Sequence, residues 1–226
     1  MDTMNLLALL ALVCIGMSSG QSGFGCCTPK VWNSDVRTLR VYVDASGSMK
    51  RQSMWQKVNY DANNKRVSVR TYRADDKDVF LRQVLDYARG ERYVIEGDRH
   101  QKCVRHPLTR PFNGACVPGN TTSVYFARVG DTTRASSPGF WENTAYFEQN
   151  DVSGYVTVTM VDCAMVVEAA FGELGRDSVS HNIQYMNQTL HALEPGAFEI
   201  PDNCVNDPME VREDPWQHFS VLGKLI

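Results

Sequence analysis

The sequence lacks the short motifs that mark common catalytic and nucleotide sites. It contains no Gly-x-Ser-x-Gly, His-Glu-x-x-His or phosphate-loop pattern, and these are signatures of serine nucleophiles, zinc proteases and nucleotide binding. It also has no Cys-x-x-Cys pair of the kind that holds zinc. We therefore expect a protein that is not an enzyme and requires no cofactor.

The chain also lacks a large excess of one charge and a membrane-length apolar run. It has 23 Lys and Arg against 26 Asp and Glu, for a formal net charge of −3, which argues against a nucleic-acid partner. Its apolar run over residues 6–17 is shorter than the roughly 20 residues that a transmembrane helix needs. Small residues follow up to Gly20, so we expect a signal peptide over residues 1–20 and a secreted, extracellular product.

Residues 21–226 show no repeat or linker, and we expect one domain whose tail after about residue 206 is loosely ordered. Cys14 lies in the expected signal peptide, and the other six cysteines predict three disulfides in an oxidising compartment. The sequence leaves their pairing open, except that adjacent Cys26 and Cys27 would form a strained ring. Asn120 and Asn187 each begin a glycosylation acceptor, Asn-Thr-Thr and Asn-Gln-Thr.

Apolar and polar residues alternate along most of the chain, and this pattern predicts strands. Leu39, Val41 and Val43, for example, lie on one face of a strand and alternate with polar or aromatic residues. Turn residues at 61–64 and 88–90 separate such runs and predict antiparallel hairpins. We expect about nine or ten strands in a mainly β domain.

Two stretches are also compatible with a short helix. Phe80, Val84 and Tyr87 have helical spacing within residues 78–90, and residues 181–193 are ambiguous between helix and strand. The sequence therefore predicts an all-β domain, or one with one or two small helices.

The stretch VYVDASGSMK places Asp44, Ser46 and Ser48 at steps of two. Von Willebrand factor A-type adhesion domains begin their metal site in this way, with oxygen ligands for a hard cation. Such domains need a fully apolar first strand and alternating helices, whereas Arg37 and Arg40 precede this stretch and another alternating run follows it. We therefore interpret residues 44–48 as a turn between two strands.

Five segments in order resemble the ependymin family of secreted glycoproteins. They are CCTPKVW from Cys26, the hairpin YDANNKRVSV, HQKCVRHPLTRPF, VTMVDCAMVVEA and LEPGAFEIPDNC ending at Cys204. The resemblance covers nearly the whole mature chain. A lipocalin is disfavoured, because Lys30 stands two residues before the first Trp, where that family has Gly.

The resemblance implies two antiparallel sheets that form a half-open β-barrel or sandwich with a hydrophobic pocket and few short helices. It implies a non-catalytic, homodimeric carrier of lipids or other hydrophobic molecules. The alternative is a calcium-binding structural or adhesive glycoprotein of extracellular or shell matrix. Calcium is the one ion that the resemblance allows, with ligands unknown.

The resemblance also implies pairs between Cys26 and Cys163 and between Cys103 and Cys204, which leaves Cys27 for Cys116. Vertebrate relatives have instead a cysteine near position 78 and another near the C-terminus, and this chain has neither. The residues that we expect to line the pocket, from the alternation of the strands, are Val41, Met54, Val58, Tyr60, Phe80, Tyr93, Tyr125, Phe147, Val158 and Met160.

Overall fold

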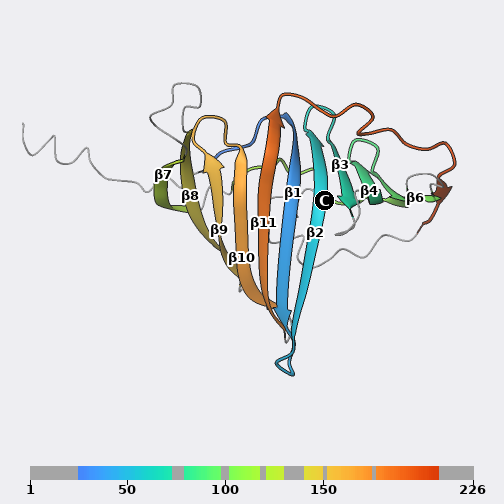
Figure 1. The fold of residues 1–226 in the computed structure, drawn as a ribbon. Helices are drawn as coiled ribbons and strands as arrows, with labels where there is room; N and C mark the ends of the chain where they lie inside the picture. The colour runs from blue at the N-terminus through green and yellow to red at the C-terminus, as the bar shows by residue number, and fades with distance from the viewer. Residues whose placement is uncertain are drawn as a thin grey trace, which may run out of the picture.

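The computed structural model is a curved β-sheet of twelve strands (Figure 1). It describes residues 25–72, 79–97, 102–117, 121–129, 140–149, 152–174 and 177–208. The strands are β1 (Val31–Val43), β2 (Met49–Asp61), β3 (Arg66–Tyr72), β4 (Val79–Asp86), β5 (Glu91–Glu96), β6 (Lys102–Pro107), β7 (Thr122–Val129), β8 (Phe140–Gln149), β9 (Val152–Thr159), β10 (Met165–Leu174), β11 (Asp177–Leu190) and β12 (Val205–Asn206).

The strands follow the order β12-β6-β5-β4-β3-β2-β1-β11-β10-β9-β8-β7. All neighbours pair antiparallel except β12 and β6, which are parallel. The mainly β prediction is confirmed, but the sheet is single rather than double. The reason is that β1 forms hydrogen-bonded ladders with both β2 and β11 and so joins the two halves.

The expected short helices are absent from the described residues. Residues 79–86 of the first helical candidate form β4, and most of the second candidate lies in β11. Each segment has strand partners on both sides, so pairing within the sheet overrides the helical spacing. Within the described ranges, no helix is long and apolar enough to cross a membrane.

The expected hairpins are present. Val43 pairs with Met49 across the turn at 44–48, and Asp61 pairs with Arg66 across the second turn. Lys65 closes that second turn with a positive φ of 52°. The β1–β2 hairpin forms the long point at the bottom of Figure 1.

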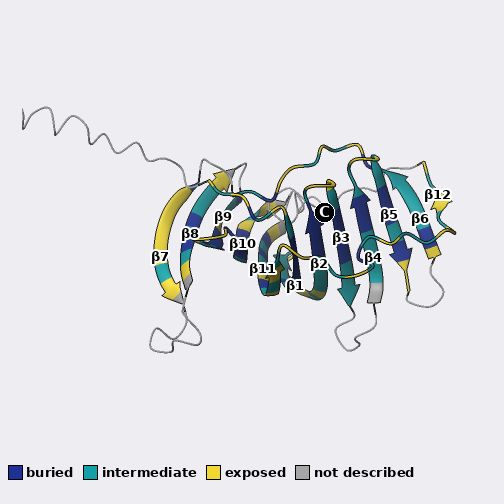
Figure 2. Ribbon diagram, turned by 90° about the horizontal axis from the view of Figure 1, so that it is seen from above, coloured by how far each residue is buried: buried dark blue, intermediate teal, exposed yellow. Residues whose placement is uncertain are grey.

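One face of the sheet turns inward (Figure 2), and we call it the inner face. A single apolar cluster contains Val58 and Val67 from β2 and β3 together with Val156 and Val158 from β9. Four other strands separate β3 from β9 in the sheet, so only a strongly curved sheet brings these side chains into one cluster. The curvature gives the molecule an interior without closing the sheet into a barrel.

A segment that we call the plug, residues 108–117, fills part of this interior. It follows β6 near one end of the sheet and leads toward β7 at the other end. Its Leu108, Ala115 and Val117 belong to the inner-face cluster. Its Phe112 stacks on Tyr60 of β2, with the ring centroids 5.8 Å apart. The plug therefore provides packing partners for both halves of the sheet.

The N-terminal segment holds the plug through main-chain bonds and a disulfide. The amide of Thr28 donates to the carbonyl oxygen of Ala115 at 2.9 Å, and the amide of Val117 donates to that of Cys26 at 2.8 Å. Cys27 is bonded to Cys116. The neighbouring Cys26 is bonded to Cys163, which follows β9.

The opposite, outer face carries a second covering segment, residues 191–204, which we call the strap. It leaves β11 at the top of Figure 1 and crosses to the β12 end of the sheet. Phe198 and Ile200 of the strap pack against Val84 and Tyr93. The disulfide between Cys103 and Cys204 fixes its far end. The structure thus contains the Cys26–Cys163 and Cys103–Cys204 pairs that the family resemblance implied, and the Cys27–Cys116 pair that those two left over.

Tyr60 offers a test of how strongly the plug is held. The buried amide of Ala115 donates to Tyr60 Oη at 3.1 Å, and replacing Tyr60 with Phe leaves that amide without this acceptor. We expect Tyr60→Phe to lower the free energy of unfolding by about 1–3 kcal/mol, the usual effect of a buried unsatisfied donor. Urea unfolding measures the change. An unchanged midpoint would show that this bond does not stabilise the plug.

Candidate functional site

The inner face changes character along its strands. On β2, successive inner positions are Val58 in the apolar cluster, then Gln56, then Met54. On β4 the same order appears as Leu85, Gln83 and Leu81, because Leu85 pairs with inner Val67 of β3. An apolar core is therefore followed by a polar position and then by a second apolar region.

We call this second apolar region the trough. Its side chains are half-buried, and none of them belongs to either packed cluster of the described residues. Three of them lie on the neighbouring strands β4, β5 and β6, because inner Gln83 pairs with Val94, which pairs with Val104. The fourth lies on the same face of β2, on the other side of β3. The trough residues are Met54, Leu81, Val94 and Val104.

The polar positions between core and trough form what we call the polar row, one residue from each of β1 to β5. These residues are Thr38, Gln56, Thr71, Gln83 and Arg92. Thr38 Oγ1 donates to Gln56 Oε1 at 3.4 Å, and Gln56 Nε2 donates to Thr71 Oγ1 at 3.3 Å. Arg92 Nη2 donates to Gln83 Oε1 at 2.7 Å. Hydrogen bonds between strands thus fix several of these side chains.

Polar groups continue onto the other half of the inner face. Tyr185 of β11 donates its hydroxyl to Glu168 Oε1 of β10 at 2.6 Å, and both side chains are buried. Burial and the adjacent carboxylate raise the pKa of Tyr185 well above its ordinary value, so its hydroxyl stays protonated. Buried His181 lies further along β11, opposite Arg40 of β1. These groups provide hydrogen bonds, but nothing about them resembles an activated nucleophile.

The sequence model of the ependymin family matches residues 75–204, which is more than half of the chain. The chain belongs to the ependymin family. The match covers β4 to β11 and the strap, and therefore includes part of the trough and of the polar row. Ependymins are generally not enzymes, and members of the family are secreted. No curated protein matches the chain.

Two solved structures are similar to this ependymin in part of their shape. An uncharacterized conserved protein from Thermus thermophilus has a TM-score of 0.43 at 9% identity, covering 88% of this chain and 99% of that one. A LolA superfamily protein from Nitrosomonas europaea has a TM-score of 0.31 at 8% identity, covering 74% and 90%. At these scores neither likeness says what this ependymin binds.

The structure divides the expected pocket residues among several environments. Val58, Tyr60 and Val158 are buried in the inner-face cluster. Met54 belongs to the trough, and Phe147 is a half-buried inner residue opposite Gly154. A Cβ added to Gly154 would lie 2.7 Å from Phe147 Cζ, so the ring fills the space that the glycine leaves.

The remaining expected pocket residues lie elsewhere. Val41 is on the outer face, because it pairs with Arg51 and Ser180 rather than with inner positions. Tyr93 is beneath the strap, Tyr125 is 62% exposed on edge strand β7, and Met160 is 44% exposed in the turn after β9. The side chain of Phe80 lies outside the described residues. Strand alternation therefore identified Met54 in the trough but missed Leu81, Val94 and Val104.

The turn that resembles an adhesion-domain metal site uses its carboxylate locally. Asp44 Oδ1 accepts hydrogen bonds from the amides of Ser46 and Ser48, both at 3.0 Å, and from the Ser46 hydroxyl. This arrangement is the usual local role of Asp in a turn. Across the described ranges, no group of three or more His, Cys, Asp and Glu residues could hold a metal ion.

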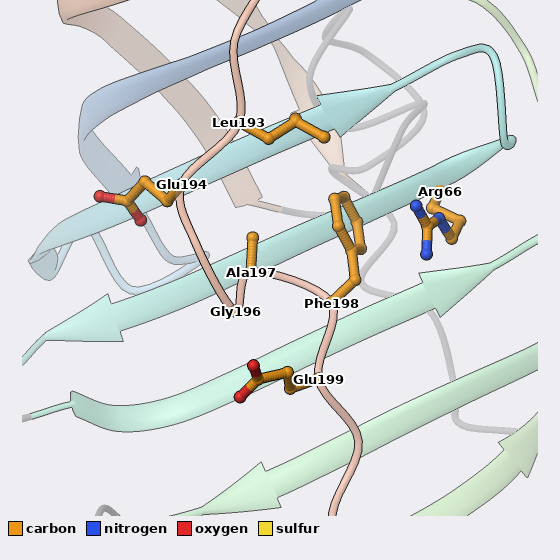
Figure 3. Close-up of a pocket in the computed structure, with 7 residues that line it drawn as sticks. All are labelled: Arg66, Leu193, Glu194, Gly196, Ala197, Phe198 and Glu199. Carbon is orange, nitrogen blue, oxygen red and sulfur yellow. The ribbon is translucent and has the colours of Figure 1, made fainter.

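A groove of about 310 Å³ lies under the strap on the outer face (Figure 3). The residues that line it are Arg66, Leu193, Glu194, Gly196, Ala197, Phe198 and Glu199. The Arg66 guanidinium lies over the Phe198 ring at 4.4 Å and also meets Asp61 Oδ2 at 2.9 Å. The groove is shallow and partly acidic, and it contains none of the expected pocket residues.

Asp61 gives this side of the groove a dependence on pH. Burial alone would raise its pKa, but hydrogen bonds from Asn64 and Arg66 outweigh burial, so the pKa of Asp61 is lowered. Its contribution to stability is therefore complete above the ordinary Asp pKa of about 3.9 and is lost as the pH falls through the lower folded value.

We expect Asp61→Asn to reduce the free energy of unfolding by about 1–3 kcal/mol at pH 7. The difference between the two proteins should shrink toward about pH 3 and below, because protonation then removes the charge of Asp61 in the parent protein as well. Urea unfolding at several pH values measures both differences. If the two proteins differ in free energy of unfolding by the same amount in neutral and in strongly acidic buffer, the lowered pKa of Asp61 is contradicted.

Proposed function

We propose that this ependymin is a secreted, non-catalytic carrier that binds the hydrocarbon part of a lipid-like ligand in the trough. The observation that carries the proposal is that Leu81, Val94 and Val104 form an apolar surface on the adjacent strands β4, β5 and β6 outside both packed clusters, with Met54 on the same face of β2. Interior apolar side chains normally pack against others at high density. An inner surface that lacks such packing is suited to a ligand.

The strength of binding follows from the area that a chain could bury. A fully buried sixteen-carbon chain gains about 0.8 kcal/mol per CH₂ group, or about 13 kcal/mol, and association costs about 4–15 kcal/mol. The difference supports micromolar-class binding of alkyl chains with little preference among them. Selectivity then depends on polar contacts beside the trough.

Ligand retention tests the proposal directly. We expect native mass spectrometry of the protein from a secreting eukaryotic host to show bound lipid that organic extraction removes. Leu81→Glu should abolish this adduct, because it places a charge in the trough. Leu39→Glu is the matched control, since Leu39 is also half-buried in a strand but pairs with Ser53 on the outer face.

Two results would contradict the carrier proposal. One is a parent protein that is empty and does not take up lipid when it is offered. The other is an adduct that survives Leu81→Glu as well as it survives Leu39→Glu. An empty protein that associates with matrix in the presence of calcium would favour the structural alternative.

We also propose that the mature chain starts after Gly20 and carries glycans on Asn120 and Asn187. Asn187 is exposed on β11, and its Nδ2 donates to Asp35 Oδ2 at 2.8 Å. A glycan there would extend from the outer side of the sheet. Asn120 lies outside the described residues.

The intact mass of the secreted protein tests this processing. We expect a mass that begins at Gln21, with one glycan removed by Asn187→Gln and another by Asn120→Gln. Digestion with an amidase specific for Asn-linked glycans should collapse all forms to the mass of the polypeptide. A parent protein whose mass is unchanged by this digestion would exclude both sites.

A further inference from the structure

We propose that the edge of β7 binds an extended, basic segment of a partner protein, which adds to the sheet as a further strand. The proposal is independent of the trough, because β7 lies at the end of the sheet opposite to β5 and β6. It starts from the exposed apolar residues of the molecule. Most of the large ones lie on β7 to β10 and in the turn after β9, and a gathering of this kind marks an interaction surface.

The strand β7 is an edge without the usual protection. Among the described strands β8 is its only neighbour, and Figure 2 shows β7 as largely exposed. An edge strand presents unpaired main-chain N–H and C=O groups, which proteins commonly protect with Lys or Pro, but residues 122–129 contain neither. A bulge interrupts the ladder between Ser123 and Tyr125, whereas every residue from Tyr125 to Val129 pairs regularly with β8. This regular part can accept a further strand.

The outer side of this edge offers a carboxylate to a basic residue. Ala127 pairs with Glu142 of β8, and Tyr125 precedes Ala127 on the same side. A residue opposite Ala127 on an added strand is two strand spacings, or about 10 Å, from Glu142. Ala127 is the one outer residue between them, and its side chain is a single methyl group. An arginine or lysine side chain can therefore lie over Ala127, beside the Tyr125 ring, and reach Glu142.

The charge of the surrounding outer face favours such a cation. Glu142, Glu148 and Glu173 lie at outer positions of β8 and β10, and the described outer positions of β7 to β10 include no Lys or Arg. Burial raises the pKa of Glu142, so a cation beside it would stabilise its charged form. The face is thus complementary to a basic partner.

The inner side of the same edge is apolar. Phe126 pairs with inner Asn143, and the next inner residue of β8 toward Val129 is Trp141. These two aromatic side chains are 55% and 53% exposed. Successive residues of an added strand point to opposite faces, so the residues between its basic positions would cover Phe126 and Trp141. The partner segment therefore alternates basic with apolar residues.

A second copy of this chain fits the edge less well. Its own β7 would offer Tyr125 and Ala127 at the regular outer positions, and neither is basic. Arg128 is on the inner side, where it pairs with Trp141. An edge-to-edge pair of copies would thus leave Glu142 without a cation.

Synthetic peptides test the proposal on the secreted protein. In one peptide Val alternates with Arg, and in the matched peptide Val alternates with Glu. We expect calorimetry in neutral buffer to show that the Arg peptide binds about 10- to 100-fold more tightly, the range for a charged hydrogen-bonded contact. The Arg peptide with methylated backbone nitrogens keeps its charge but loses its main-chain donors, and it should lose most of its affinity.

Glu142→Gln should reduce the preference for the Arg peptide to less than about threefold. Ala127→Lys should do the same, because it supplies a cation to Glu142 from β7 itself, and it covers the case in which Glu142→Gln does not fold. Glu148→Gln is the matched control. Glu148 lies on the same face of β8, six residues or about 20 Å along the strand, and its carboxylate accepts the Tyr146 hydroxyl at 3.1 Å.

Three results would overturn the proposal, and none of them affects the carrier function. The first is an Arg peptide that binds no more tightly than the Glu peptide, or a preference that survives both Glu142→Gln and Ala127→Lys. The second is a methylated peptide that binds as well as its parent. The third is a protein that binds neither peptide; loss of a dimer in Tyr125→Lys would then assign the edge to a second copy.

Discussion

The packing of the plug against the inner face is the contact on which the rest of this structure depends. A sheet of this curvature leaves an interior that its own side chains do not fill, and residues 108–117 supply the missing apolar partners. Tyr60 binds the amide of Ala115, and Cys116 ties the same segment to the N-terminal part of the chain. The curvature of the sheet and the burial of its inner face therefore both depend on the path that the chain takes after β6.

The same constraint explains where the proposed ligand surface lies. The described plug covers the inner positions near Trp32, Val58 and Leu85, and the packed core ends at the polar row. Beyond the row, the trough keeps its apolar character without packing partners from the two clusters of the described chain. The proposed site is thus the part of the curved sheet's interior that the described plug does not cover, and the Cys27–Cys116 disulfide ties that plug to the N-terminal segment.

Much of the local structure was predictable, because it depends on neighbours in sequence. The alternation around Val41, the turn at 44–48 and the break after Asp61 predict strands and hairpins that the structure contains. The choice between helix and strand was harder to predict for residues 78–90 and 181–193, since an apolar pattern at spacings of three and four does not exclude a strand. Pairing with distant strands decided both of them.

The pocket could not be predicted in the same way. Alternation shows that Val41 and Tyr42 face opposite sides, but not which side is inner, because that depends on how β1 pairs with β2 and β11. The sequence by itself determined the strands, the turns, the cysteine content and the likeness to the ependymin family. Only the tertiary structure decided the single sheet, the inner face and the polar row, because the register across five strands is what places Thr38 and Arg92 on the same face.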